Sequence, residues 1–100
     1  MNSPQIEKLD DTTFRLNGEL NMYSVPQMLN AISAPLSTGP GELCIDLGGV
    51  SRSDSAGLAL LVEWMRQAKE RQVKLRFRNL PLQLREIARI SDLLSLLPLD

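Results

Sequence analysis

The chain has 100 residues, of which 43% are hydrophobic and 23% charged, and its formal net charge at pH 7 is −1. This length fits one domain with a modest core, so residues 1–100 are expected to form a single domain. Because the net charge is small and only 4% of the residues are aromatic, neither a nucleic-acid partner nor binding to an anionic surface is expected.

The N-terminal residues predict a β-hairpin. Residues 5–9 and 12–16 are short β-prone runs on either side of Asp10-Asp11, which suits a turn. In the second run Phe14 and Leu16 alternate with polar residues, so one face of this strand is expected to be buried and the other solvated.

The next segment predicts the first helix. Ser24-Val25-Pro26 marks its start, because a hydroxyl can cap a helix and a proline fits the first turn. Pro35 and the turn-forming residues 37–41 are expected to end it. Apolar residues recur between these limits at helical spacing and predict one buried stripe, made of Val25, Met28, Leu29, Ile32 and Leu36.

Residues 42–47 predict a strand bounded by glycine-containing turns. Leucine and isoleucine side chains occupy one face of this run, and Cys44 lies on the other. A run that is largely apolar on both faces predicts a central strand covered on both sides. Cys44 is therefore expected to be a buried and unreactive thiol.

The second helix is predicted over residues 55–72. Leu60 and Trp64 lie beside the centre of its apolar stripe, near Arg71, and have two interpretations. They add to the packing, or the three residues form a partner surface, since Trp and Arg are enriched at interface hot spots. The side expected to lie on the sheet consists of Leu58, Leu61, Val62, Met65 and Ala68.

The last third of the chain predicts a strand, a helix and a short helical turn. Residues 73–78 alternate between apolar and basic, which is typical of an edge strand with one solvated face. Asn79-Leu80-Pro81 leads into a third helix, and Ser91-Asp92 is expected to cap a turn over residues 93–97. This leucine-rich tail either covers the sheet edge or meets a partner.

Strands and helices that alternate after a first hairpin predict an α/β domain. We expect a mixed sheet of about four strands, three main helices and a short C-terminal helical turn. No apolar run approaches the roughly 20 residues of a membrane span, and the N-terminus lacks a signal-peptide pattern. The protein is therefore expected to be cytoplasmic, with no direct insertion into a membrane.

Histidine is absent, and Cys44 is the single cysteine. Without histidine the chain lacks the commonest general base and the commonest metal ligand, so we expect no catalytic residues, no metal site and no cofactor. A single cysteine cannot form an internal disulfide and fits a reducing compartment. The composition thus favours a binding function over an enzyme.

Small polar residues gather where the second helix should begin, in Ser53-Asp54-Ser55-Ala56-Gly57. The simplest interpretation is that one of the three polar residues caps the helix, which is worth about 1 kcal/mol. A cap is exposed, so capping is compatible with a recognition role. Gly57 would allow close approach of the sheet or of a partner. Ser55 is a poor candidate nucleophile, because it has neither the G-x-S-x-G context nor a histidine base.

This stretch resembles the STAS domain family (sulfate transporter and anti-sigma factor antagonist domains). The resemblance rests on Asp46-Leu47, Val50 and Asp54-Ser55-Ala56-Gly57-Leu58, which match the family pattern hydrophobic-D-S/T-x-G-L/I. Gly18-Glu19-Leu20 resembles the family's GELD segment, with Asn21 in place of Asp. The resemblance covers nearly the whole chain and implies the α/β fold of the family.

The resemblance implies a binding function with two alternatives. In anti-sigma factor antagonists of the family, a kinase phosphorylates the serine that matches Ser55. In STAS subunits of phospholipid-transporting ABC complexes, the same position docks the ATPase subunit, and residues 44–47, 50–52 and 57–61 are most similar to these. The predicted phosphorylation or docking residues are Ser53, Asp54, Ser55 and Gly57.

We expect the transporter alternative. The protein would be a non-catalytic accessory subunit at the inner face of the inner membrane, bound to the ATPase and through it to the permease and lipid-binding subunits. The resemblance then implies a part in maintaining the lipid asymmetry of the outer membrane. An antagonist of an anti-sigma factor is the other alternative, because both functions would use the same helix start.

Overall fold

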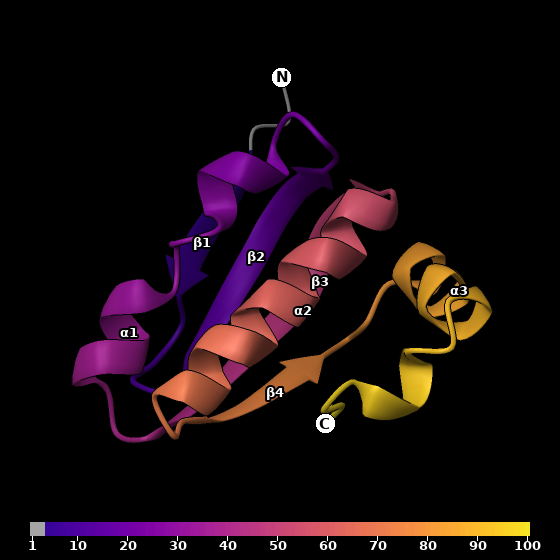
Figure 1. The fold of residues 1–100 in the computed structure, drawn as a ribbon. Coiled ribbons are helices and arrows are strands. Elements are labelled where there is room, and N and C mark those ends of the chain that lie inside the picture. Colours follow the sequence, from indigo (N-terminus) through magenta and orange to yellow (C-terminus); the bar gives the residue numbers. More distant parts are fainter. Residues whose placement is uncertain (1–3) are drawn as a thin grey trace.

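The computed structural model describes residues 4–100 (Figure 1). In this range the strands are β1 (Gln5–Lys8), β2 (Thr13–Leu20), β3 (Glu42–Ser53) and β4 (Lys74–Arg78). The α-helices are α1 (Ser33–Thr38), α2 (Ser55–Glu70) and α3 (Leu82–Ile90), and the 3₁₀ helices are η1 (Val25–Met28) and η2 (Leu94–Leu96). The predicted α/β domain with a four-stranded sheet, three helices and a short C-terminal helical turn is confirmed.

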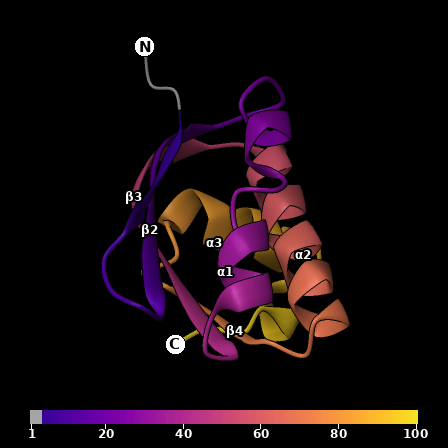
Figure 2. The same ribbon diagram turned by 90° about the vertical axis from the view of Figure 1, so that its left-hand side faces the viewer.

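The sheet is mixed, with strand order β1-β2-β3-β4. β1 and β2 form the predicted antiparallel hairpin, whereas β2 pairs with β3, and β3 with β4, in parallel. Figure 2 shows that the helices lie on one face of the sheet. One hydrophobic cluster fills the space between the sheet and the helices, and it includes side chains from β2, β3, α2, β4 and α3.

β3 is a central strand, as predicted, but the prediction that both of its faces are covered by other elements is wrong. Its apolar face lies in the core, and in residues 4–100 the helices cover only this face (Figure 2). Cys44 is nevertheless buried, at 4% exposure, with Thr13 and Arg76 beside it on the neighbouring strands. Long arginine stems can shield a sheet face without a second layer. Burial raises the pKa of the Cys44 thiol.

The predicted single helix after Ser24 is wrong, because the segment forms η1 and α1 with a turn between them. Pro35 was expected to end a helix, but it lies inside α1. Proline is tolerated in the first turn, where its missing N–H is not needed, so a new helix starts just before it. Ser24 does not cap η1 and instead donates its hydroxyl to Glu19 O at 2.8 Å. Four residues of the predicted stripe are buried, namely Val25, Met28, Ile32 and Leu36.

β2 and β3 are longer than predicted and reach Leu20 and Ser53. Gly48-Gly49 was expected to end β3, but the strand continues through both glycines, with register shifts against β2. A Cβ atom at Gly49 would collide with the Asn17 side chain, so glycine allows the two strands to stay paired here. Because β3 continues to Ser53, α2 starts beside the C-terminal end of β2.

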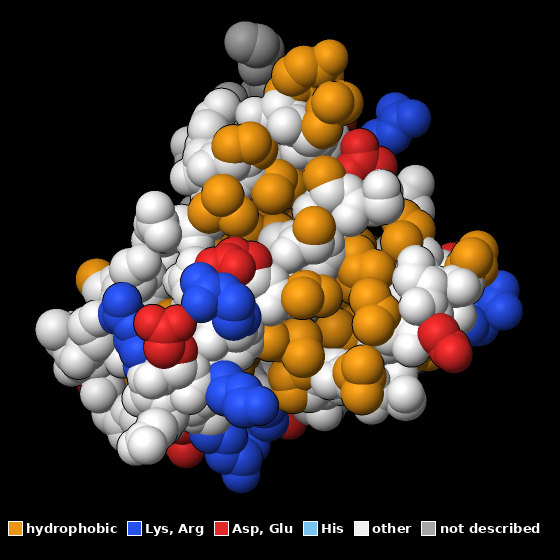
Figure 3. Space-filling view, in the orientation of Figure 1, with side chains coloured by type: hydrophobic (Ala, Val, Ile, Leu, Met, Phe, Trp, Pro, Cys, Tyr) orange, Lys and Arg blue, Asp and Glu red, His pale blue; other side chains and the backbone are white. Residues whose placement is uncertain are grey.

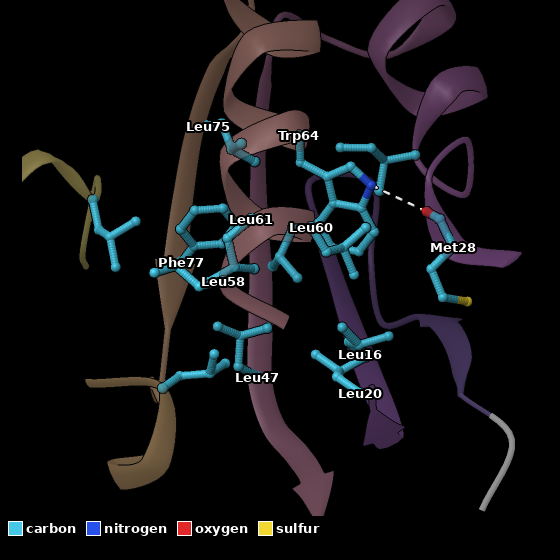
Figure 4. Packing of buried hydrophobic residues seen from close by; sticks show 14 of the residues in the cluster. Leu16, Leu20, Met28, Leu47, Leu58, Leu60, Leu61, Trp64, Leu75 and Phe77 are labelled. Atoms are coloured by element: carbon cyan, nitrogen blue, oxygen red, sulfur yellow. Dashed lines mark hydrogen bonds between the residues drawn. The ribbon is translucent and has the colours of Figure 1, made fainter. Parts of the chain in front are cut away.

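The buried side of α2 is rotated from the predicted one. Leu60 and Trp64 are fully buried, whereas Val62 is 42% exposed. The reason is that η1 packs against the flank of α2, where Trp64 Nε1 donates to Met28 O at 3.1 Å (Figure 4). The packing interpretation of Leu60 and Trp64 is confirmed, and their assignment to a partner surface is wrong. Arg71 is exposed, and its guanidinium donates to Ser33 O at 3.3 Å and contacts Ser37 Oγ.

The C-terminal residues cover the outer edge of β4. Phe77 N–H donates to Pro98 O, Asp100 N–H donates to Phe77 O, both at 2.8 Å, and Leu99 forms a parallel bridge with Phe77. These contacts come from residues 98–100, just past the predicted tail of residues 93–97, in which Leu97 is buried in the core and Leu96 is 64% exposed, so neither interpretation of the tail is confirmed. The predicted cap by Ser91-Asp92 is wrong, because η2 has no side-chain cap and Asp92 adopts the left-handed conformation (φ 62°) after α3.

Candidate functional site

The junction between β3 and α2 brings the four predicted site residues together at one end of the molecule (Figure 1). Ser53 is the last residue of β3, Asp54 is the N-cap of α2, Ser55 is the first helical residue, and Gly57 lies in the first turn. The strand positions this turn firmly, because Ser53 pairs with Leu20 and Asp54 N–H donates to Leu20 O at 3.1 Å.

The three polar residues have different environments. Asp54 is the cap, since its Oδ1 accepts from Ala56 N–H at 2.8 Å. Ser53 is 7% exposed, its N–H donates to Gln83 Oε1 at 2.9 Å, and its hydroxyl donates to Asp54 O at 3.0 Å. Ser55 is exposed, and its hydroxyl is neither the cap nor part of the bonds that hold the turn. Ser55 is thus the hydroxyl of this trio that a partner or a kinase can reach.

Gly57 is buried and allows the start of α2 to approach the sheet closely. A Cβ atom at this position would overlap Ser53 Oγ and lie 3.2 Å from Leu84 Cδ2 and 3.3 Å from Leu20 Cβ. Of the two predicted uses of this glycine, the approach of the sheet is therefore confirmed. Gly57 lies on the side of α2 that faces the sheet and does not face a partner.

The cap assignment gives a direct prediction for stability. Asp54→Ala removes the acceptor for Ala56 N–H and should lower the free energy of unfolding by about 1 kcal/mol. Ser55→Ala removes an exposed hydroxyl that makes no cap and should change it by less than about 0.5 kcal/mol. Urea denaturation of both variants measures the difference, and equal losses would contradict the assignment of Asp54 as the cap.

A shallow apolar groove of about 360 Å³ begins at Ser55 and follows the exposed side of α2. Its floor is largely apolar, and its rim carries Glu63 and Arg66, which are joined by a 2.7 Å ion pair. Hydrogen bonds from Arg66 and Gln67 lower the pKa of the Glu63 carboxyl to about 2, so this rim stays charged at neutral pH. The remaining lining residues are Leu58, Ala59, Val62 and Leu93.

Sequence reasoning missed two residues at the same end of the molecule. Met22 and Tyr23 follow β2 and are 67% and 80% exposed. Figures 1 and 2 both place their loop beside the start of α2. The available signal was their position between Asn21 and Ser24, outside the helical stripe that begins at Val25. Large apolar residues in a turn, outside any periodic pattern, are candidates for exposure.

Two kinds of feature, a metal-binding cluster and a membrane-spanning helix, are not found among the described residues. In residues 4–100, no three His, Cys, Asp or Glu side chains lie close enough together to coordinate a metal. None of the helices in this range combines the length and hydropathy of a membrane span.

Comparison with known proteins agrees with this architecture. The family described as "Mlab, STAS domain" matches residues 6–98. No curated protein sequence matches the chain. Structures of the anti-sigma factor antagonist SpoIIAA in its unphosphorylated form and of the Bacillus cell fate determinant SpoIIAA in the phosphorylated form are similar. Their TM-scores are 0.71 and 0.67 at 22% and 21% identity, and each match covers 97% of this chain and 87% and 90% of the other.

A third similar structure is an anti-sigma factor antagonist from Mycobacterium paratuberculosis. It has a TM-score of 0.72 at 22% identity, and the match covers 99% of this chain and 85% of the other. At these identities the structural likeness shows the fold. The family match extends over nearly the whole length of the sheet and helices described above. The chain therefore belongs to the STAS domain family.

Proposed function

We propose that this chain is a non-catalytic subunit that docks on the ATPase of a phospholipid-transporting ABC complex, as a protein similar to MlaB of the Mla transporter of Gram-negative bacteria. Its place would be the inner face of the inner membrane, and it would reach the permease and lipid-binding subunits through the ATPase. The family description and the sequence runs 44–47, 50–52 and 57–61 support this partner.

The observation that carries the proposal is the exposure of Ser55 on a rigid helix start. The cap and the β3 pairing are satisfied by Asp54 and Ser53, so Ser55 is available for contact without loss of structure. Ala56 next to it brings no bulky side chain that would keep a partner away. A shallow apolar groove with a hydroxyl at its end suits docking better than catalysis, since the described residues place no histidine base beside Ser55.

Two substitutions at Ser55 test the docking surface. Ser55→Ala should bind the purified ATPase with nearly the affinity of the unchanged protein. Ser55→Glu puts a charge beside Asp54 in a contact that loses its water, and an unpaired buried charge costs several kcal/mol. We expect at least about a 30-fold loss of affinity in calorimetry, since each 1.4 kcal/mol is tenfold.

Stability measurements provide the control for this experiment. Glutamate in the first turn of a helix is favoured by the helix dipole, so Ser55→Glu should melt within a few degrees of the unchanged protein. A folded Ser55→Glu variant that binds the ATPase normally would place the docking surface elsewhere.

An antagonist of an anti-sigma factor is the second candidate, and the similarity to SpoIIAA and to the mycobacterial antagonist favours it. In this function a partner kinase would phosphorylate Ser55, and the added charge of about −1.5 to −2 would release the partner. The two candidates are separated by binding assays with the ATPase and with an anti-sigma kinase. Binding of the kinase, together with a phosphate on Ser55 found by mass spectrometry, would replace the transporter proposal.

A further inference from the structure

The loop between β2 and η1 presents two large apolar side chains to solvent. Tyr23 is 80% exposed and Met22 is 67% exposed, and no other large hydrophobic residue in the described range is more exposed than Tyr23. In Figure 3 apolar side chains protrude over this loop, at the end of the molecule where α2 begins. Burial of such side chains in a partner is favourable, because it removes apolar surface from water.

The loop is held in place by its own hydrogen bonds. Asn21 Oδ1 accepts from Tyr23 N–H at 2.9 Å and from Ser24 N–H at 3.0 Å, and Asn21 Nδ2 donates to Glu19 Oε2 at 2.9 Å. Ser24 Oγ accepts from Asn21 N–H at 2.9 Å and donates to Glu19 O at 2.8 Å. These bonds use backbone groups of Tyr23 and leave its ring outside. The ring is thus displayed from a rigid support.

The same bonds explain the residue at position 21. Asn21 donates to the Glu19 carboxylate, which an aspartate at this position would repel. Asparagine therefore supports the shape of the loop. A rigid loop loses little conformational entropy on binding, and tyrosine supplies contact area at a low entropic cost.

We propose that Met22 and Tyr23 form the apolar anchor of the docking surface and insert into an apolar pocket of the partner protein that covers Ser55. This inference rests on the proposed function. The two parts of the surface are joined through the backbone, because Leu20 O, directly before the loop, accepts from Asp54 N–H at 3.1 Å. The loop therefore lies beside the helix start that carries Ser55, and tyrosine is among the residues enriched at interface hot spots.

A protein partner fits this loop better than a lipid surface. Membrane-surface anchors combine apolar side chains with lysine and arginine that meet anionic headgroups. Residues 19–24 contain one charged residue, the acidic Glu19, and the exposed Arg52 lies opposite it on β3, so the two charges offset each other. The loop thus lacks the excess of basic charge that an anionic lipid surface attracts, whereas a pocket in a protein needs only shape and apolar lining.

Binding of Tyr23→Ala and Met22→Ala to the purified ATPase tests the anchor. We expect Tyr23→Ala to weaken the affinity by roughly tenfold or more, and Met22→Ala by a smaller factor. Melting temperatures should stay unchanged, because the side chains are exposed and the loop bonds use the backbone. Leu96→Ala is the matched control: its side chain is 64% exposed and lies on η2, away from the loop (Figure 1), and this variant should bind normally.

The outcomes separate this inference from the proposed function. If the unchanged protein binds and Ser55→Glu does not, but Tyr23→Ala binds normally, the anchor is overturned and the docking function stands. If the unchanged protein binds neither the ATPase nor an anti-sigma kinase, both are overturned. Flotation of the unchanged protein, but not of Tyr23→Ala, with anionic phospholipid vesicles would assign the loop to a membrane, and a dimer lost in Tyr23→Ala would assign it to a second copy; either result overturns the anchor.

Discussion

Trp64→Ala is expected to lower the free energy of unfolding by about 3–5 kcal/mol, the usual range for removing a fully buried aromatic side chain. The indole is 0% exposed and lies between η1 and the sheet (Figure 4). Its removal leaves a cavity, and Met28 O loses the hydrogen bond from Trp64 Nε1. A domain of this size is stable by only about 5–15 kcal/mol, so this loss is a large fraction of its free energy of unfolding.

Trp64→Phe is the control for this prediction. Phenylalanine keeps most of the buried area and loses the hydrogen bond, so we expect a smaller loss of about 1–3 kcal/mol. Urea denaturation followed by circular dichroism measures both variants. Normal stability of Trp64→Ala together with a loss of partner binding would contradict this prediction. That result would place Trp64 on the surface, whereas the structure has it fully buried.

Asp46→Ala is expected to cost about 1.5–3 kcal/mol, because it removes a buried carboxylate that accepts two hydrogen bonds, and hydrogen bonds to charged groups contribute about this much. Asp46 is 5% exposed on the face of β3 opposite the helices. Its Oδ1 accepts from Gly48 N–H at 2.8 Å and from Asn79 Nδ2 at 3.0 Å, and Arg15 Nη2 lies 3.5 Å from Oδ2. These bonds tie the end of β4 to the glycine segment through which β3 continues toward Ser55.

Arg15→Ala provides the comparison for Asp46→Ala. The Arg15 side chain is 42% exposed, and a partly solvated ion pair at 3.5 Å contributes little, so we expect a loss below about 1 kcal/mol. Equal losses in the two variants would mean that the ion pair, and not the bonds to Gly48 and Asn79, carries the stabilisation. Chemical denaturation at neutral pH distinguishes these results.

The Asp46 carboxylate is also expected to make the free energy of unfolding depend on pH in the acid range. Burial raises the pKa of Asp46, but the hydrogen bonds from Asn79 and Gly48 and the nearby Arg15 outweigh it, and the net pKa lies below its ordinary value. A depressed folded pKa contributes stability above the unfolded pKa of about 3.9, and this contribution is lost as the pH falls through the folded pKa. The stability advantage of the unchanged protein over Asp46→Asn should therefore be constant near neutral pH and shrink below about pH 4. An advantage that persists into acid would contradict the role of the ionised form.

The start of α2, where the candidate site lies, could be predicted from the sequence because a helix cap depends only on neighbouring residues. A capping side chain acts on N–H groups two or three residues away, so Asp54 and Ser55 locate the start of α2 without reference to the rest of the fold. The alternation of residues 73–78 likewise reflects the two faces of one strand, and β4 has it. The class of the fold followed from the order of such elements.

Only the tertiary structure decided which faces are covered and where the strands end. Whether Trp64 is buried depends on η1, which is distant in sequence and packs on the flank of α2. β3 extends past Gly48-Gly49 because β2 is there to pair with it, and Cys44 is shielded by neighbouring strands without a second layer of helices. The exposure of Tyr23 arises from bonds that fold the loop around Asn21. Each of these outcomes is a contact between separate segments, and periodicity within one segment carries no information about the neighbour it will meet.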